Sequence, residues 1–355
     1  MKDEKRRYSS GIKEIARRAG VSIGTVDRVI HGRPGVSPKT KEKVDAIINE
    51  LGYQPNLVAR RLASKRYIRI GTLTPKVPGE TVYWEAILNG IKRAEAETED
   101  YSVIVENYFF DQNDKRSFVL QAEVLLYSGV DGIVLTPIFI EESTHLAQMC
   151  QKENIPFVFI NSDLPGVQSL CYIGPNLFQS GYLAAHLIGY LTRSGDKVMV
   201  LNISRELEQF HYTLRKEEGF RDYCGKFLTG LGIVKADIRQ TDYDSIKREV
   251  SQLLQEHKDT KVIFVTNSRV STVAQYLSTL DHKSSILIGY DFLPDNIKHL
   301  ERGTIDFLIC QKPQEQSYQG VMTLYHHLAF LTEVEPVNFM PIDIITRENY
   351  SSYTN

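Results

Sequence analysis

The sequence predicts an all-α N-terminal headpiece of three helices, followed by a larger α/β body that contains more than one parallel sheet. Apolar residues recur at helical spacing in three short segments before residue 52. From Tyr67 onward, short β-rich apolar runs alternate with amphipathic helical stretches, which is typical of parallel sheets covered by helices. The predicted strands are Ile68–Leu73, Ser102–Glu106, Gly132–Leu135, Phe157–Ile160, Tyr172–Ile173, Val198–Leu201, Val262–Val265, Ile286–Gly289 and Phe307–Cys310. A chain of 355 residues is long enough for two or three domains.

The first two helices are predicted between residues 11 and 30. Gly20 tolerates the positive φ that ends the first helix and opens a tight turn, and Ser22 is a suitable N-cap for the second. The apolar face of the first helix consists of Ile12, Ile15, Ala16 and Ala19, and that of the second of Val26, Val29 and Ile30. This arrangement is typical of a helix-turn-helix.

A third helix is predicted from Ser37 to Leu51. Ser37 caps it, Pro38 takes its first position and Gly52 ends it. Its apolar stripe consists of Val44, Ile47, Ile48 and Leu51.

Charge is unevenly distributed along the chain. Residues 1–66 hold 16 Lys and Arg against 7 Asp and Glu, a net charge of +9, whereas the remainder carries −11. A basic head on an acidic body is typical of a protein that binds the DNA phosphate backbone. On charge alone, a solvated basic arm explains the pattern equally well.

In a helix-turn-helix, the N-terminal residues of the second helix face the bases in the major groove. Arg28 is the best candidate for a bidentate contact with guanine. Asp27 would either accept a hydrogen bond from a cytosine amino group or hold Arg28 in place. The alternative interpretation is three structural helices with charged faces.

The segments that follow resemble the LacI/GalR regulators. The third helix ends in Leu51-Gly52-Tyr53-Gln54-Pro55-Asn56, and the family has L-G-Y-x-P-N there, followed by a short hinge helix. The resemblance implies double-stranded operator DNA as a partner. The residues it assigns to DNA binding are Ser22, Ile23, Gly24, Thr25, Asp27, Arg28, His31, Asn56, Ala59, Arg60 and Leu62.

A hinge of residues 56–63 is too short to be a stable helix alone in water, so we expect it to order only when two copies pack on DNA. The resemblance implies that Leu62 is wedged into the minor groove between base steps, which kinks the duplex. The alternative is that Leu62 joins a hydrophobic core. Arg60 and Arg61 are expected near phosphates.

The body resembles the periplasmic sugar-binding type I fold that the family uses as its regulatory core. Two doubly wound subdomains joined by three crossovers would enclose a ligand between them. We expect a headpiece at 1–54, a hinge and linker at 55–66, an N-subdomain at 67–174 plus 312–340, and a C-subdomain at 175–311 plus 341–355.

Ligands in open α/β sheets lie at the carboxyl ends of the strands, so polar and aromatic residues there are candidates. Trp84, the only tryptophan, and Tyr83 are suited to stacking on a sugar ring. The resemblance carries ligand binding to Asn161, Asn176, Asn267, Asp291 and Gln311. Ser162 and Arg215 complete the predicted set, although Lys216 also precedes Gly219-Phe220 and leaves the register open by one. Each of these residues has a structural turn role as its alternative.

The sequence departs from common sugar binders, which often have Asp-Arg at Asn161-Ser162 and Asn-Asp at Asn267-Ser268. With fewer charges there, the ligand need not be a common aldopentose or aldohexose.

Other classes of protein are disfavoured. No apolar run reaches 18 residues and no secretory signal is recognised, so we expect a cytoplasmic protein without a membrane partner. The four cysteines are far apart, which suits neither a zinc site nor a disulfide framework. No nucleophile elbow, phosphate-binding loop or metalloprotease motif is present. We therefore expect no enzymatic activity, no cofactor and no metal.

The sequence thus predicts a ligand-responsive transcriptional regulator, expected to be a repressor, that binds a pseudo-palindromic operator as a homodimer. Its effector is expected to be a sugar or sugar derivative, and the resemblance places the dimer surface near Tyr83–Glu97. The main alternative, a solute-binding protein of a sugar transport system, would have a signal peptide and no headpiece. A non-specific nucleoid-type DNA binder would not need so large a ligand-binding body.

Overall fold

The computed structural model describes residues 11–30, 33–51, 53, 67–77, 83–205, 211–280 and 285–354. The chain forms two compact units, Met1–Ser64 and Lys65–Asn355, and each is described separately. Five residues predicted to contact DNA lie outside the described residues: His31, Asn56, Ala59, Arg60 and Leu62.

The first unit contains three helices, α1 (Ile12–Ala19), α2 (Ile23–Ile30) and α3 (Pro38–Leu51). One fully buried side chain from each helix, Ile15, Val26 and Val44, meets in a small core. Gly20 has a φ of 68°, and the backbone N–H of Thr25 donates to Oγ of Ser22 at 3.1 Å. The predicted turn and N-cap of the helix-turn-helix are therefore confirmed.

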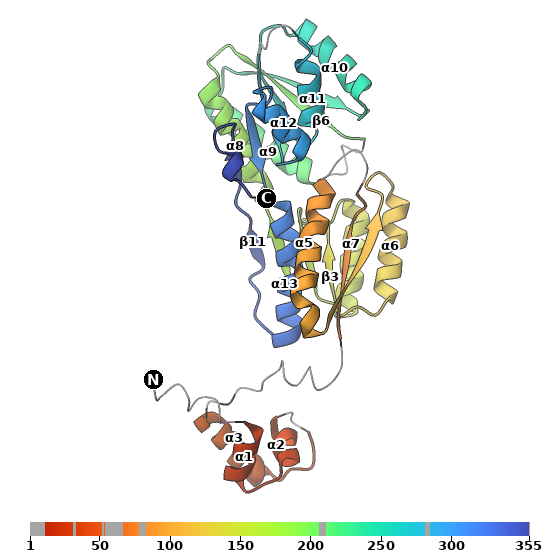
Figure 1. Cartoon of the computed structure of the whole chain (residues 1–355), viewed down its shortest axis with the longest axis vertical. Helices are drawn as coiled ribbons and strands as arrows, with labels where there is room; N and C mark the ends of the chain where they lie inside the picture. The colour runs from red at the N-terminus through yellow and green to blue at the C-terminus, as the bar shows by residue number, and fades with distance from the viewer. Residues whose placement is uncertain are drawn as a thin grey trace. The chain divides into compact units, whose positions relative to one another are not determined.

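The first sheet of the second unit has the strand order β11-β5-β4-β3-β1-β2, and all its pairings are parallel. Its strands are β1 (Ile68–Pro75), β2 (Val103–Phe110), β3 (Gly132–Leu135), β4 (Phe157–Ile160), β5 (Cys171–Gly174) and β11 (Val337–Phe339). Helices α5 (Tyr83–Thr98) and α13 (Pro313–Phe330) pack together beside it, and α6 (Lys115–Tyr127) and α7 (Ile140–Lys152) form another pair (Figure 1).

The second sheet has the order β12-β10-β9-β8-β6-β7, with only β12 antiparallel to its neighbour. Its strands are β6 (Lys197–Ile203), β7 (Gly232–Ile238), β8 (Thr260–Val265), β9 (Ile286–Tyr290), β10 (Phe307–Cys310) and β12 (Asp343–Ile345). One face buries α8 (Leu177–Leu191) and α9 (His211–Phe227), and the other buries α10 (Tyr243–Glu256), α11 (Val270–Leu277) and α12 (Pro294–Glu301).

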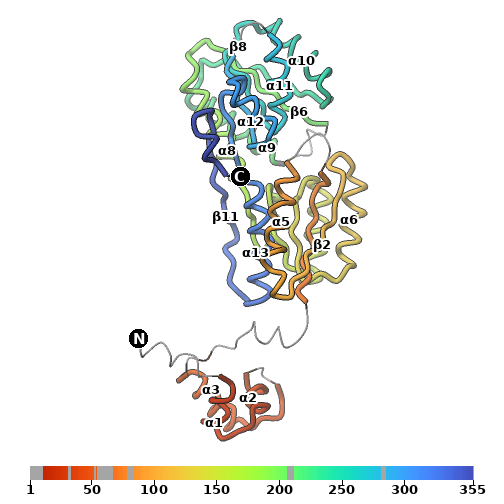
Figure 2. Tube along the Cα trace, viewed as in Figure 1, coloured from red at the N-terminus to blue at the C-terminus, as the bar shows by residue number. Residues whose placement is uncertain are grey.

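The chain passes between the sheets after β5, after β10 and after β11, and Figure 2 allows these three crossovers to be followed in the described residues. The first five strands of each sheet occupy the same relative positions, so β1 to β5 correspond to β6 to β10. The predicted fold class, a helix-turn-helix headpiece followed by two doubly wound subdomains, is confirmed. The two sheets turn the carboxyl ends of their strands towards a shared pocket.

Candidate ligand pocket and DNA-binding face

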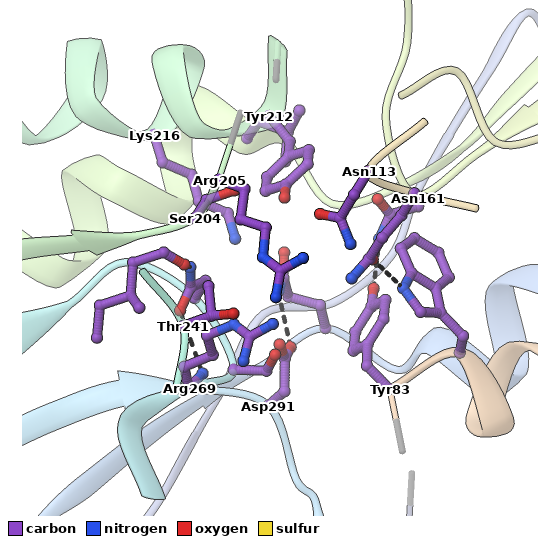
Figure 3. Close-up of a pocket in the computed structure, with 17 residues that line it drawn as sticks. Tyr83, Asn113, Asn161, Ser204, Arg205, Tyr212, Lys216, Thr241, Arg269 and Asp291 are labelled. Carbon is purple, nitrogen blue, oxygen red and sulfur yellow. Dashed lines mark hydrogen bonds between the residues drawn. The ribbon is translucent and has the colours of Figure 1, made fainter. Parts of the chain in front are cut away.

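The pocket encloses about 760 Å³ of empty space, which includes its open mouth. Loops that follow strands of both sheets line it (Figure 3). Its described lining residues are Tyr83, Trp84, Gln112, Asn113, Asn161, Leu177, Ile203, Ser204, Arg205, Tyr212, Lys216, Thr241, Asn267, Ser268, Arg269, Asp291 and Gln311. The structure thus brings together six of the nine residues predicted to bind ligand.

Two buried aromatic side chains form part of the wall on the side of the first sheet. Tyr83 and Trp84 pack edge to face, with ring centroids 5.0 Å apart. Nε1 of Trp84 donates to Oε1 of Gln112 at 2.7 Å, and Nδ2 of Asn161 donates to Oη of Tyr83. Both hydrogen bonds fix the rings, so an aromatic surface is ready before any ligand binds.

Asp291 follows β9 in the left-handed region, with a φ of 74°. Its Oδ1 accepts from Nε2 of Gln311 at 2.9 Å, and the carbonyl oxygen of Gln311 accepts in turn from Nε2 of Gln316. Burial raises the pKa of Asp291 to about 6, although the positive charge of Lys216 and the Gln311 hydrogen bond act in the opposite direction. The carboxyl group can therefore change its charge near neutral pH.

Asn267 lines the pocket, but its side chain also holds the backbone. Nδ2 donates to the carbonyl oxygen of Ile203 at 2.7 Å, and Oδ1 accepts from the backbone N–H of Arg269 at 3.1 Å. The amide therefore ties the end of β6 to the loop after β8. It positions Arg269 at the pocket whether or not it contacts ligand itself.

Three predicted residues lie outside the pocket lining. Ser162 is buried, and its hydroxyl donates to the carbonyl oxygen of Asp163 at 3.2 Å. Asn176 is the N-cap of α8 and accepts from the backbone N–H of Gln179. Arg215 points away on the outer side of α9, where it pairs with Glu218 and lies over the ring of Phe178. The first two serve local turns and caps.

Lys216, rather than Arg215, faces the pocket. It lies on the buried stripe of α9 with Thr213 and Phe220, three and four residues away, and is 4% exposed. Its Nζ lies 3.8 Å from the centroid of the Tyr290 ring. Burial lowers the pKa of Lys216 to about 8, partly opposed by the charge of Asp291. Helical phase therefore resolves the register that sequence spacing left open by one.

Two glycines allow α9 to pack closely against α8. A Cβ on Gly181 of α8 would lie 1.8 Å from the carbonyl oxygen of Lys216, and one on Gly219 would lie 1.9 Å from that of Phe178. The two helices can therefore approach closely only because neither position has a side chain. This contact sets how far the Lys216 ammonium reaches into the pocket.

Sequence reasoning missed several pocket residues: Gln112, Asn113, Ser204, Arg205, Tyr212, Thr241 and Arg269. Arg205 follows β6 and directs its guanidinium into the pocket (Figure 3). Thr241 follows β7, and its buried hydroxyl has no hydrogen-bond partner in the part of the chain that the structure describes. The strand-end rule would have found both residues if β6 had been predicted at its full length and β7 had been predicted at all.

On the headpiece, the described reading residues run from the N-cap Ser22 along α2 to Arg28, which lies in the last turn of the helix. Gly24 and Arg28 are exposed, and the side chain of Ile23 is 50% exposed. Hydroxyls of Ser22 and Thr25 bond to each other at 2.9 Å. Asp27 accepts from Arg33 at 3.2 Å, so this carboxylate has a cation from within the headpiece beside it.

Family comparisons agree with both units. Residues 11–56 match the model of bacterial regulatory proteins of the lacI family, and residues 70–332 match that of a periplasmic binding protein domain. Catabolite control protein A of Priestia megaterium is 31% identical over 256 residues, which cover 72% of this chain and 73% of that protein. The chain belongs to the LacI family of bacterial regulatory proteins. It is a DNA-binding transcriptional regulator with a small-molecule-binding body.

Solved structures extend this comparison over the body. A putative LacI transcriptional regulator from Bacteroides fragilis has a TM-score of 0.77 at 28% identity and covers 81% of this LacI-family chain and 100% of its own. The glucose-galactose binding protein GanP from Geobacillus stearothermophilus has a TM-score of 0.71 at 21% identity, covering 80% and 99%. The second likeness concerns the fold alone.

None of the described helices combines the length and the apolar character needed to cross a membrane. Within the same residues, His, Cys, Asp and Glu form no group of three or more that could hold a metal ion.

Proposed function

We propose that this regulator represses transcription by binding a pseudo-palindromic operator as a homodimer, and that a sugar or sugar derivative in the pocket changes its affinity for the operator. The observation that carries the ligand class is the aromatic pair Tyr83 and Trp84 beside the amides of Gln112, Asn113 and Asn161. An aromatic surface suits the apolar face of a sugar ring, and amides satisfy hydroxyls as both donors and acceptors.

The proposed ligand-binding residues are the six predicted ones that line the pocket, together with Arg205, Lys216, Thr241 and Arg269. The proposed DNA contacts are those of the sequence analysis, with Arg28 reading a base and the hinge residues acting on the minor groove. The subdomain boundaries given there stay part of this proposal. We also propose a cytoplasmic protein without enzymatic activity.

Control would follow from a two-state equilibrium of the body. A ligand that touches both walls of the pocket favours the closed arrangement of the two sheets because only that arrangement makes all its contacts. Closure would shift the N-subdomains of a dimer relative to each other and change how the two hinges pack. Ligand and operator are then coupled through one conformational change, and each alters the affinity for the other.

The proposed dimer surface lies on α6 and β2. Large apolar side chains are exposed there, and three on α6 decide the choice: Leu120 is 60%, Val124 56% and Tyr127 87% exposed. Ile104 and Phe109 of β2 extend the patch. Helix α5, the surface expected from the sequence, packs its apolar face within the chain, with Gly90 close to Gln314 of α13, but it keeps an exposed polar face and stays a second proposed surface. A second copy would cover the α6 patch and remove it from water.

A Leu120→Glu variant tests this surface by analytical ultracentrifugation. A charge placed in the centre of a dimer interface should yield monomers and weaken operator binding, since each half-site would then be bound separately. Leu331→Glu, a change at another exposed leucine, should leave the oligomeric state unchanged. If the Leu120→Glu variant remained dimeric, the interface would have to lie elsewhere on the protein.

DNA reading is tested by selecting binding sites from random sequences with wild-type and Arg28→Ala protein. Loss of a bidentate guanine contact should cost about 1–3 kcal/mol and relax the preference at one base pair of each half-site. An unchanged preference would contradict the role of Arg28. Adding single sugars to the wild-type assay tests ligand control, because an effector must change the fraction of operator bound.

A further inference from the structure

We propose that the ligand carries an anionic group, a carboxylate or a phosphate, on its sugar-like part, and that Lys216, Arg205 and Arg269 hold this group. The inference rests on the proposed function, since it names the chemical class of the ligand in the same pocket. It follows from how charge and hydrogen-bonding groups are distributed between the two walls.

Cationic side chains outnumber carboxylates among the described residues that line the pocket. Among the described lining residues, Lys216, Arg205 and Arg269 are cationic, and Asp291 is the only carboxylate. The three cations come from separate places in the fold, α9, the end of β6 and the loop after β8. A pocket for a neutral polyol has no need of three converging cations, whereas an anion is bound by such a set.

The buried ammonium of Lys216 gives the strongest single support for an anionic ligand. It is 4% exposed, and within the described residues its ammonium makes no hydrogen bond or ion pair, only cation–π contacts with the Tyr290 ring at 3.8 Å and the Tyr212 ring at 5.9 Å. The charge of Asp291 acts on it from the same pocket. Burying an ammonium is unfavourable unless an acceptor compensates for the lost water, and an anionic oxygen in the pocket would supply one.

Thr241 is a second, independent observation that favours an anionic group on this side of the pocket. Its hydroxyl is buried, lines the pocket and lacks a hydrogen-bond partner in the described part of the chain. Figure 3 shows Thr241 on the same side as Lys216, Arg205 and Arg269, with Ser204 close by. A carboxylate or phosphate has enough acceptor oxygens to bond a hydroxyl and several cations together.

The opposite wall has a different character. Tyr83, Asn113 and Asn161 lie across the pocket in Figure 3, and Trp84 and Gln112 complete that side. These groups are neutral at physiological pH, because burial raises the pKa of Tyr83 well above its usual value. A ligand with a polyhydroxylated ring at one end and an anionic group at the other matches both walls at once.

Isothermal titration calorimetry of the full-length protein with matched ligands tests this proposal. The sets are glucose with glucuronate and glucose 6-phosphate, and galactose with galacturonate, with inorganic phosphate as the minimal probe. At least one anionic member should bind about tenfold or more tightly than its neutral partner. Preference for the uronates or for the phosphate ester identifies the source of the anion.

Variants locate the site. Arg205→Gln changes an exposed side chain at the pocket mouth and leaves folding intact, and Lys216→Gln removes the buried cation. Both should lose most of the preference for the anion, by about tenfold. Arg215→Gln, a neighbouring cation outside the pocket, should retain it. A preference that persists in Arg205→Gln and Lys216→Gln would overturn the assignment.

Failure of this inference and failure of the proposed function give different results. Neutral sugars that bind at least as tightly as their anionic partners, or the absence of binding by any anion up to millimolar concentrations, would overturn the inference. If a neutral sugar then changes operator binding, the proposed function stands. If an anion binds through Lys216 and Arg205 while operator binding never responds, the inference stands and ligand control fails.

Discussion

Asn161 and Asp291 occupy equivalent positions in the two halves of the body. Asn161 follows β4 and Asp291 follows β9, the third strand from the edge in each sheet, and both have a left-handed backbone with φ of 71° and 74°. The backbone N–H of each donates to the next strand, to Ile173 and Ile309. Asn and Asp tolerate this conformation better than most residues, so the turn itself favours an amide or a carboxyl group. Only the second position carries a titratable group.

This asymmetry predicts how ligand binding depends on pH. Asp291, with a pKa of about 6, loses its charge as the pH falls, and Lys216, with a pKa of about 8, loses its charge as the pH rises. A carboxylate ligand such as a uronate, which stays ionised throughout this range, should therefore bind most tightly near pH 5.5, more weakly at pH 7, and weakest above pH 9. Arg205 and Arg269 stay charged throughout, while the facing tyrosines, whose pKa values burial raises, stay neutral: Tyr83, Tyr212 and Tyr290.

Titration calorimetry of wild-type and Asp291→Asn protein between pH 5.5 and 9 measures this dependence. The variant keeps an oxygen that can accept from Gln311 but has no carboxyl group to titrate. Its affinity should lack the change near pH 6 that Asp291 causes. It should also begin to fall at a lower pH than in wild type, because the charge of Asp291 that raises the pKa of Lys216 is gone. Identical profiles for the two proteins would show that Asp291 does not titrate in this range.

Removing the buried charge of Lys216 should stabilise the ligand-free protein. Because its pKa is lowered on folding, the unfolded chain binds the proton more tightly, so the penalty is fully present below pH 8. It disappears as the pH rises from about 8 towards 10.5. Lys216→Met should thus increase the free energy of unfolding at pH 7 by up to about 3 kcal/mol, as an upper bound.

Chemical denaturation at two pH values measures that difference. The gain of Lys216→Met over wild type should be large at pH 7 and small near pH 10.5, where both proteins are neutral at this position. Arg215→Met, on the exposed side of the same helix, should show no such pH-dependent gain. If Lys216→Met were instead less stable at pH 7, the ammonium would be well compensated without ligand.

Most of the strands and helices that position the pocket could be predicted from the sequence, because buried strands and amphipathic helices leave strong apolar patterns. Three strands, β7, β11 and β12, escaped prediction, and each lies at an edge of its sheet. β7 lies at a sheet edge and alternates Lys235 and Asp237 with smaller apolar residues, and β11 is exposed along its length. Thr241 was missed together with β7.

Side-chain direction was harder to predict than position. Asn176 and Arg215 stand near the pocket in sequence, yet one caps α8 and the other faces outward. Lys216 could have been found from its spacing to Phe220, since a lysine on the buried stripe of an amphipathic helix is unusual. The partner of Asp27, Arg33, lies beyond the reading helix, where propensity carries no information about pairing.

The contact between α8 and α9 should tolerate no side chain at Gly219. An added Cβ would meet the carbonyl oxygen of Phe178 at 1.9 Å, and backbone atoms cannot move aside cheaply. Gly219→Ala should therefore push α9 outward, lower the free energy of unfolding by about 1–3 kcal/mol and withdraw Lys216 from the pocket. Thermal unfolding and ligand titration measure both effects.

Gly225→Ala in the same helix is the matched control. Its Cβ would meet nothing within 4 Å, and replacing an exposed helical glycine by alanine usually stabilises a helix by up to about 1 kcal/mol. If Gly219→Ala were as stable as the wild type, α8 and α9 would be able to move apart without lowering the free energy of unfolding.

Packing within the headpiece does not require glycine at position 24, but the proposed close approach of α2 to DNA does. In the headpiece, a Cβ at this position would meet only Oγ of Ser22, at an ordinary 3.7 Å, so no packing within the headpiece requires glycine. Alanine should stabilise α2 by about 0.5–1 kcal/mol. The residue lies exposed at the N-terminal end of the proposed reading helix, where an added methyl group would stand between the backbone and the bases.

We therefore expect Gly24→Ala to unfold at a higher denaturant concentration yet to bind operator more weakly. Fluorescence anisotropy with labelled operator measures the affinity, and Gly225→Ala controls for the same substitution outside the headpiece. Because stability and affinity should move in opposite directions, a general loss of folding cannot imitate this result. Equal or tighter operator binding by Gly24→Ala would mean that this turn of α2 does not approach the DNA.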